Sequence, residues 1–209
     1  MNPEKFKAQM LGPKEFSEPA LAGIAVHAAC FGGEVLPDVG NFIVDPSVVD
    51  EVLRVSKFDP KTEIPEVPFM MHFPEFSARV SGRCDVLGDT RTIEAKTTKG
   101  KWNEARPGLD KYARLPQSMV YASYFKVPCE IHVVHIKVSK PRSRPEGSLG
   151  LVSLAEGIGS PVGVTVVEPS ETVKKTLDDW VAKAVEYISR DEDMLLHCLK
   201  KGQKEQPVF

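Results

Sequence analysis

The chain has 209 residues, of which 42% are hydrophobic and 27% charged, with 27 lysines and arginines against 29 aspartates and glutamates. This length and apolar content exclude a wholly disordered chain and suit one domain over 1–209. No apolar run approaches the roughly 20 residues of a membrane span. Residues 1–5 lack the profile of a secretory leader, so we expect a cytoplasmic protein (host cytoplasm if it is viral). The net charge of −2 argues against a uniformly basic surface.

The first helix has clear boundary signals. Ser17 can cap it, Pro19 suits its first turn, and glycines 32 and 33 end it after the small, apolar run 20–31. In the later segments, apolar residues that repeat every second position indicate strands, a repeat of about 3.6 indicates helices, and segments with neither pattern are expected to be loops. They predict a helix over 46–55, an extended segment from 64, strands over 76–87 and 90–97, an irregular polar stretch over 99–114, a helix over 116–125, a strand over 128–138, a mobile loop over 139–160, a strand over 162–167, a helix over 171–190 and a polar tail.

This order of elements predicts an α/β fold with a mixed central sheet flanked by helices. Its core would span about 17–138, and 161–209 would add the last strand, helix and tail.

The hairpin around 88–89 determines which polar side chains meet. Gly-Asp at these positions favours a two-residue type II′ turn, which would set Asp85 opposite Thr92. Because residues two apart in a strand share a face, Glu94 and Lys96 would lie on the same side as Asp85. Asp85 and Glu94 would then be diagonal neighbours, with Lys96 one pleat beyond.

Two carboxylates and a lysine on one polar patch have a specific chemistry. Mg²⁺ and Mn²⁺ prefer oxygen ligands, and a carboxylate pair supplies two of them. A neighbouring lysine can orient or deprotonate a water that attacks phosphorus. The alternative is a solvated hairpin face with an ordinary cross-strand ion pair, and three residues alone do not separate the two interpretations.

Three further motifs accompany the hairpin. They are G-x-x-x-H at 23–27, G-x-x-D at 82–85 and Q-x-x-x-Y at 117–121, and together with E-x-K at 94–96 they occur in a fixed order. In this order and spacing, residues 20–138 resemble the RecB-like branch of the PD-(D/E)XK nucleases, and within it the stand-alone phage-type exonucleases. The resemblance implies a restriction-endonuclease-like core.

The resemblance also implies roles for the motif residues in a metal-dependent DNA exonuclease. Lys96 would position the attacking water, Gln117 would position the lysine or the phosphate, and Tyr121 would contact DNA. The implied ligands of Mg²⁺ or Mn²⁺ are His27, Asp85, Glu94 and the carbonyl of Ala95. The alternatives are a hydrogen-bonded core histidine at 27, and a helix-cap glutamine with a half-buried tyrosine at 117 and 121.

Glycine at 23 lies one helical turn before His27, on the same helix face. A glycine there would let the helix approach the sheet closely.

Positive charge gathers beside the hairpin, mainly within 96–114, so a near-neutral total conceals a local basic groove. Such a segment beside a metal site is typical of a strand-entry path for DNA. Alternatively, Arg79 and Arg83 are ordinary surface residues of a strand, and Trp102 packs within its own loop. The candidate DNA contacts are Arg79, Arg83, Lys99, Lys101, Trp102, Arg106, Lys111 and Arg114.

The cysteines at 30, 84, 129 and 198 form no CxxC motif or Cys/His cluster. Some relatives in this branch hold an iron–sulfur cluster through cysteines grouped after the core, and because only Cys198 follows the core here, none is expected. The expected partner is DNA, as a single strand or a duplex end, with no membrane. A homo-oligomer such as a trimeric ring and a recombination partner protein are compatible with this. The rival functions are a structure-selective endonuclease and a non-catalytic nucleic-acid-binding module.

Overall fold

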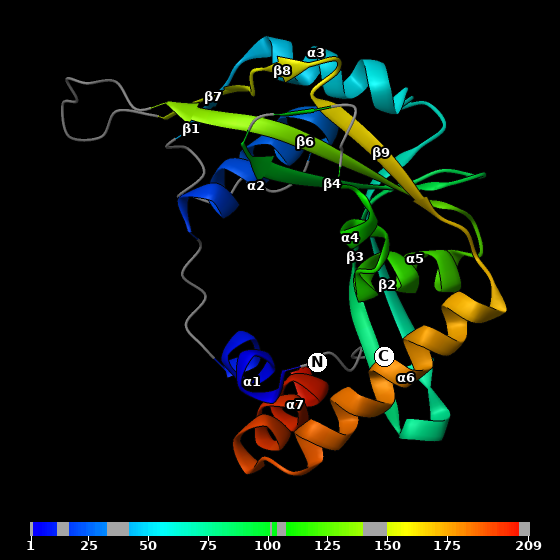
Figure 1. Ribbon diagram of the computed structural model, residues 1–209. Coiled ribbons are helices and arrows are strands. Elements are labelled where there is room, and N and C mark those ends of the chain that lie inside the picture. The colour runs from blue at the N-terminus through cyan, green and yellow to red at the C-terminus, as the bar shows by residue number, and fades with distance from the viewer. Residues whose placement is uncertain are drawn as a thin grey trace.

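The computed structural model describes residues 2–11, 17–32, 42–100, 102–103, 108–139 and 150–204. Within these ranges the chain forms a mixed seven-stranded β-sheet flanked by helices (Figure 1), so the predicted α/β class is confirmed. The strand order is β1-β7-β6-β4-β3-β2, with β9 also paired to β6, and β5 and β8 form a separate pair. The strands are β1 (Phe42–Val44), β2 (Ile64–Phe73), β3 (Ala78–Leu87), β4 (Thr92–Lys99), β5 (Trp102–Asn103), β6 (Cys129–Ser139), β7 (Gly150–Leu154), β8 (Gly157–Ile158) and β9 (Val162–Val167).

Helices cover both faces of the sheet and enclose two apolar clusters. On one face, α2 (Glu18–Phe31) and α3 (Pro46–Ser56) pack on a cluster that includes Ile93 and Ile136. On the other face, α5 (Pro116–Phe125) and α6 (Glu171–Ser189) pack on a cluster that includes Ile131 and Tyr121. The remaining helices are α1 (Pro3–Leu11), η2 (Pro74–Phe76), α4 (Asp110–Ala113) and α7 (Glu192–Lys204).

Local signals place several of these elements where the sequence predicts them. The helix α2 begins after Ser17 and ends at Gly32, whose φ of 80° is easily adopted by glycine. At the start of α6, Ser170 accepts a hydrogen bond from the backbone N–H of Val173 at 3.2 Å, as an N-cap does. The predicted bounds of α5 and β9 match the structure at both ends.

The hairpin between β3 and β4 differs from its prediction. Leu87 pairs with Thr92, so the loop contains four residues, 88–91, rather than two. Arg91 explains the longer loop, because its guanidinium donates to Glu63 Oε1 at 2.9 Å and to Glu130 Oε2 at 2.8 Å. These contacts hold residue 91 in the loop instead of in the strand. The observed register, continued along β3, sets Asp85 opposite Glu94 rather than diagonal to it.

Eight elements of the described residues were not predicted, and they are α1, β1, η2, β5, α4, β7, β8 and α7. Of these, β5 and α4 lie within the stretch 99–114 that was expected to be irregular. The strand β7 lies inside the predicted loop over 139–160, of which 140–149 lie outside the described residues; in β7, Gly150 and Val152 are buried while the residue between them is exposed. The predicted polar tail is a helix, α7, which packs beside α1 (Figure 1) and buries Met194. Lys7 of α1 donates to Asp191 at 2.6 Å. The short strand β1 pairs with β7.

None of the helices in the described ranges has the length and apolar character needed to cross a membrane.

Candidate functional site

A cleft opens where β3 separates from β4. Among the described residues, the β3–β4 ladder joins Leu87 to Thr92 and Val86 to Ile93 and then stops, while β4 continues beside β6 as far as Lys99. The β2–β3 hairpin runs across the direction of β4 and β6 toward α6 (Figure 1). One edge of β4 is therefore left open to side chains from α2, β2 and α5.

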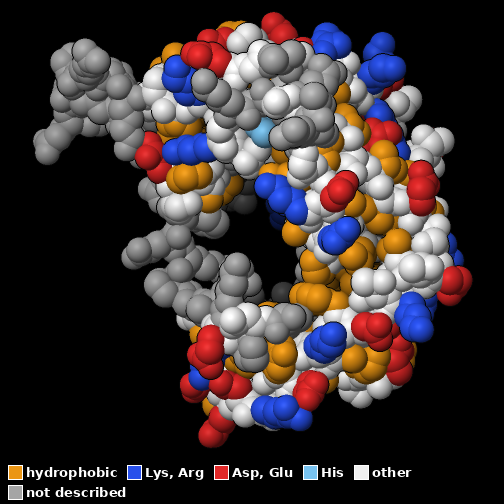
Figure 2. Space-filling view, viewed as in Figure 1, with side chains coloured by type: hydrophobic (Ala, Val, Ile, Leu, Met, Phe, Trp, Pro, Cys, Tyr) orange, Lys and Arg blue, Asp and Glu red, His pale blue; other side chains and the backbone are white. Residues whose placement is uncertain are grey.

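The cleft has a volume of about 600 Å³. Figure 2 shows this face of the molecule hollowed at its centre, with lysine and arginine side chains on the margin of the hollow. The residues that line the cleft come from α2, β2, β3, β4 and α5, and they are Ala20, Gly23, Ile24, His27, Ala28, Glu66, Arg83, Asp85, Glu94, Ala95, Lys96, Thr97 and Gln117.

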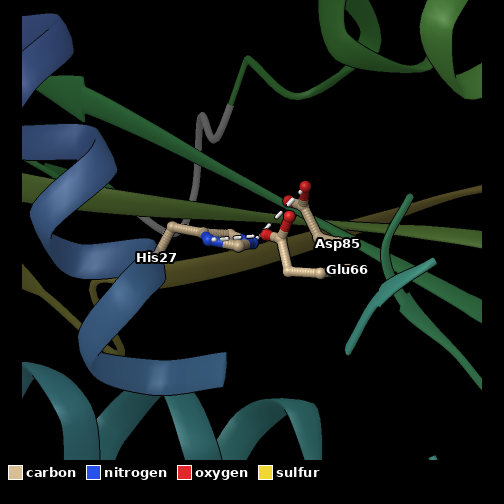
Figure 3. A group of neighbouring side chains, drawn as sticks. All are labelled: His27, Glu66 and Asp85. Carbon is tan, nitrogen blue, oxygen red and sulfur yellow. Dashed lines mark ion pairs between the residues drawn. The ribbon is translucent and has the colours of Figure 1, made fainter. Parts of the chain in front are cut away.

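Three of these side chains converge on one point. His27 of α2 faces two neighbouring carboxylates, with Nδ1 3.4 Å from Glu66 Oε1 and Nε2 3.4 Å from Asp85 Oδ1 (Figure 3). One ligand atom from each of the three residues lies within 4.8 Å of the others. A single cation can therefore be reached by all three.

The close approach of α2 to β4 depends on Gly23, as expected. A Cβ atom at this position would lie 2.5 Å from Thr97 Oγ1, which is too close for two unbonded atoms. Glycine therefore sets the distance between helix and strand, and His27, one turn further along α2, is carried toward Asp85 as a result.

Glu66 is the member of this group that the sequence reasoning did not include. The β2–β3 register pairs Pro65 with Val86 and Val67 with Cys84, so Glu66 stands opposite Asp85. Its φ is 56°, in the left-handed region that non-glycine residues seldom adopt in a strand. An acidic residue next to a proline at such a position was the available signal, but it has meaning only once the β2–β3 register is known.

Glu94 is buried beside this group. Glu94 is only 1% exposed, and its Oε1 accepts a hydrogen bond from Lys96 Nζ. Glu94 Oε2 is buried without a hydrogen-bond partner, and so is His27 Nε2, whose 3.4 Å approach to Asp85 lies outside hydrogen-bond geometry. Burying polar atoms without a partner lowers the stability of the fold unless something binds them.

The electrostatics favour positive charge in the cleft. Burial, reinforced by the charge of Asp85, raises the pKa of Glu94 despite the opposing effect of Lys96. Burial alone would lower the pKa of His27, but the carboxylates of Asp85, Glu66 and Glu94 outweigh it, so that pKa is raised. Both shifts show that the acidic groups accumulate more negative charge than their surroundings stabilise. The carboxylate oxygens of this group are donors that Mg²⁺ and Mn²⁺ prefer.

Ala95 lines the cleft, but the interaction shown is through its backbone N–H rather than its carbonyl. That group donates to Asp85 Oδ2 at 2.8 Å. The structure therefore brings together all four predicted metal-binding residues in one cleft and adds Glu66. Whether they bind metal remains a prediction.

Lys96, Gln117 and Tyr121 also come together, through hydrogen bonds. Lys96 Nζ donates to Gln117 Oε1 at 2.8 Å, and Gln117 Nε2 donates to the hydroxyl of Tyr121 at 2.7 Å. Tyr121 itself is 1% exposed and packs against Phe69, with ring centroids 5.4 Å apart. It does not line the cleft, so its position argues against the DNA contact that the resemblance implies.

The predicted DNA contacts are more scattered. Arg83 lines the cleft and pairs with Glu66 at 3.1 Å. Arg79 lies four residues earlier on β3, outside the cleft lining, and Lys99 lies at the far end of β4. Lys111 and Arg114, in and after α4, are exposed. Lys101, Arg106 and the side chain of Trp102 lie outside the described residues.

Comparison with models of protein families finds none that matches this chain, and comparison with curated proteins finds no match either.

Proposed function

We propose that this chain is a metal-dependent deoxyribonuclease of the RecB-like PD-(D/E)XK branch, hydrolysing phosphodiester bonds. The observation that carries the proposal is the convergence of His27, Glu66 and Asp85 within 4.8 Å. Within this group His27 Nε2 is buried without a hydrogen-bond partner, and so is Oε2 of the neighbouring Glu94. A cluster of this kind is stabilised most directly by a bound divalent cation, and Lys96 stands next to it.

The proposed ligands are His27, Glu66, Asp85 and Glu94, with Mg²⁺ or Mn²⁺ as the ion. When bound, such an ion supplies the Lewis-acid charge that activates water and offsets the negative charge developing on the phosphate. The raised pKa values of His27 and Glu94 mean that metal binding displaces protons from the site.

Lys96 has the role closest to the reaction. Two of its N–H donors go to Glu94 and Gln117, which fixes the ammonium group at the cleft wall and leaves one donor for an oxygen in the cleft. That donor can orient the attacking water or stabilise a phosphate oxygen. Arg83, exposed at the same cleft, is placed to contact a backbone phosphate.

The same proposal extends to the mode of action. By the resemblance, the enzyme acts as an exonuclease on DNA ends in recombination, repair or phage DNA processing. A trimeric ring and a recombination partner protein belong to this extension. Mg²⁺ or Mn²⁺ is the only cofactor it requires.

The test is digestion of end-labelled DNA, single-stranded and double-stranded, linear and circular, with Mg²⁺, with Mn²⁺ and with EDTA. Linear DNA should be degraded from an end in either metal and left intact in EDTA, while circles survive. Cleavage of circles would instead support the structure-selective endonuclease, and DNA binding without cleavage in Mn²⁺ would support the non-catalytic module. A Lys96→Met protein purified in parallel should be inactive, and a Lys175→Met protein, altered on the exposed side of α6, should be active; equal activity in both would indicate a contaminating nuclease.

A further inference from the structure

A continuous chain of hydrogen bonds links the backbone of β3 to Lys96. The hydroxyl of Tyr121 donates to the carbonyl oxygen of Arg83 at 2.8 Å and accepts from Gln117 Nε2 at 2.7 Å. Gln117 Oε1 then accepts from Lys96 Nζ at 2.8 Å. The chain runs from β3 through two residues of α5 to β4.

The donors and acceptors in this chain allow only one arrangement. A carbonyl oxygen can only accept, so the single hydroxyl hydrogen of Tyr121 goes to Arg83. Toward Gln117 the same hydroxyl can then only accept, which requires the NH₂ end of the amide to face it. The oxygen end of Gln117 is thereby directed at Lys96, whose ammonium group can only donate. The tyrosine hydroxyl and the lysine ammonium group thus require the same orientation of the amide, and the hydroxyl holds its NH₂ end in place.

The hydrogen bond to the Tyr121 hydroxyl helps to fix the orientation of the Gln117 side chain. Gln117 is an exposed residue at the start of α5, whereas Tyr121, one turn further along, is buried and packs against the rings of Phe69 and Phe125. A buried ring is a rigid support for an exposed amide. Without the hydroxyl, the NH₂ group of Gln117 loses its acceptor, and the side chain is free to leave the position in which its oxygen meets Lys96.

We infer that Tyr121 is a positioning residue of the proposed nuclease, which acts through Gln117 to hold Lys96 and does not bind DNA. The inference rests on the proposed function for its kinetic part. Its structural part, the control of the Gln117 amide by the Tyr121 hydroxyl, can be measured without any reaction.

The experiment compares Tyr121→Phe with Tyr124→Phe on a linear oligonucleotide in saturating Mg²⁺. Both variants remove one hydroxyl from a tyrosine of α5, but Tyr124 is 39% exposed and lies outside the cleft lining. Displacement of a group by about 1 Å costs on the order of 100-fold in rate. Tyr121→Phe should therefore lower kcat by roughly 10- to 100-fold with KM changed less than twofold, while Tyr124→Phe should leave both parameters unchanged. A raised KM with unchanged kcat would show that Tyr121 contacts DNA and would overturn the inference.

A double-mutant cycle tests the path through Gln117. Once Gln117→Ala has removed the amide, Tyr121→Phe should have no further effect on kcat, because residues that act through one another are not additive. Additive losses would overturn the inference, as would a Tyr121→Phe protein with wild-type kinetics. If the wild-type protein cuts none of the substrates, the proposed function fails, and the kinetic part of the inference fails with it.

The activity-free measurement is the ¹⁵N spectrum of side-chain amides. The Gln117 pair is identified by its loss in Gln117→Ala, and it should shift in Tyr121→Phe but not in Tyr124→Phe. Thermal unfolding of the variants confirms that each remains folded. An unshifted Gln117 signal in a folded Tyr121→Phe protein would overturn the structural part, whatever the catalytic result.

Discussion

The carboxylate of Asp85 accepts the backbone N–H of Ala95 at 2.8 Å, at the point where the β3–β4 ladder ends. The observed register sets Cys84 opposite Ala95, so the next ladder hydrogen bond would have gone to the backbone there. The Asp85 side chain takes the N–H instead, and β3 is free to turn away from β4. The same residue that stops the pairing also lies in the His27–Glu66–Asp85 group.

This double role predicts different effects for two substitutions of Asp85. Asp85→Asn keeps an oxygen for the Ala95 N–H but loses the negative charge, so it should abolish the rise in thermal midpoint that Mn²⁺ causes. When Mn²⁺ is present at 100 times its Kd, its binding should stabilise the wild-type fold by about 2.7 kcal/mol. Asp85→Ala should in addition lower the metal-free midpoint, because a buried N–H without an acceptor costs about 1–3 kcal/mol.

Differential scanning fluorimetry with EDTA and with Mn²⁺ measures both effects. Asp89→Asn, in the exposed hairpin loop, is the control and should behave as the wild type does. A full Mn²⁺ shift in Asp85→Asn would contradict the assignment of Asp85 as a ligand.

Lys96 should separate chemistry from metal binding. Lys96→Met keeps most of the side-chain volume and removes the donor, and loss of one such donor typically costs about 100- to 1,000-fold in kcat. Because the lysine is not a ligand, the Mn²⁺-dependent rise in thermal midpoint should persist. Single-turnover cleavage and fluorimetry on the same sample check the two halves, and a variant that loses both would show that Lys96 is needed to assemble the site.

The raised pKa of Glu94 makes the metal-free protein sensitive to pH. A carboxyl whose pKa is higher when folded than when unfolded stabilises the fold fully below its unfolded pKa of about 4.3, and that stability declines as the pH rises toward the folded value. Glu94→Gln cannot lose this proton. In EDTA, its midpoint should therefore exceed that of the wild type increasingly between pH 5 and pH 8, by a few degrees if about 1 kcal/mol corresponds to 2–4 °C.

The control for this measurement is Glu156→Gln, whose carboxylate is largely exposed. Its midpoint difference from the wild type should be flat over the same pH range. His27, whose pKa is also raised, contributes the same decline to the wild type and to Glu156→Gln, whereas in Glu94→Gln its pKa loses the contribution of the Glu94 charge and is raised less. A constant difference for Glu94→Gln would show that Glu94 keeps its charge without metal.

Elements fixed by local chemistry were predictable from the sequence. The helix α2 has its proline near the start and a glycine at its end, and the amphipathic stripe of α6 includes Leu177 and Val181, which are buried as its periodicity requires. Motif order also brought His27, Asp85 and Glu94 into one predicted cluster, and the structure places all three in one cleft.

Elements fixed by distant contacts were not predictable in this way. The Gly-Asp pair at 88–89 favours a two-residue turn on local grounds, but Arg91 is held by Glu63, 28 residues away, and by Glu130, 39 residues away. Glu66 joins the cluster through the β2–β3 register and an unusual φ, neither of which its neighbours specify. The apolar side of α7 likewise has meaning only once α1 packs beside it.

The contact between α2 and β4 predicts a change of sign in a double-mutant cycle. Gly23→Ala alone should destabilise the fold by about 1–2 kcal/mol, because its Cβ would meet Thr97 Oγ1 at 2.5 Å and overpacking is costly. In a Thr97→Ala background that oxygen is gone, and the same change should stabilise the fold by up to about 1 kcal/mol through helix propensity. Urea unfolding of the four proteins gives both values, and a destabilising Gly23→Ala in both backgrounds would locate the conflict elsewhere.

The Arg91 contacts should be the strongest ionic contribution to stability away from the cleft. Beyond its two carboxylate partners, Arg91 Nη2 donates to the carbonyl oxygen of Ser56 at 2.8 Å, so one side chain joins the end of α3, the residue before β2, and β6. Removing one partner of a buried ion pair costs about 3–5 kcal/mol. Because Arg91 retains some exposure, Arg91→Ala should cost about 3 kcal/mol, toward the lower end of that range.

Lys174→Ala provides the comparison, since it removes an exposed i,i+4 pair with Asp178 and should leave the free energy of unfolding almost unchanged. Urea unfolding of both variants measures the difference. The thermal midpoint of Arg91→Ala should be lower than that of the wild type, and Mn²⁺ should still raise it, because residue 91 lies outside the cleft lining. Equal stability losses in the two variants would mean that the loop is held by its backbone rather than by the guanidinium, and the four-residue hairpin would then need another explanation.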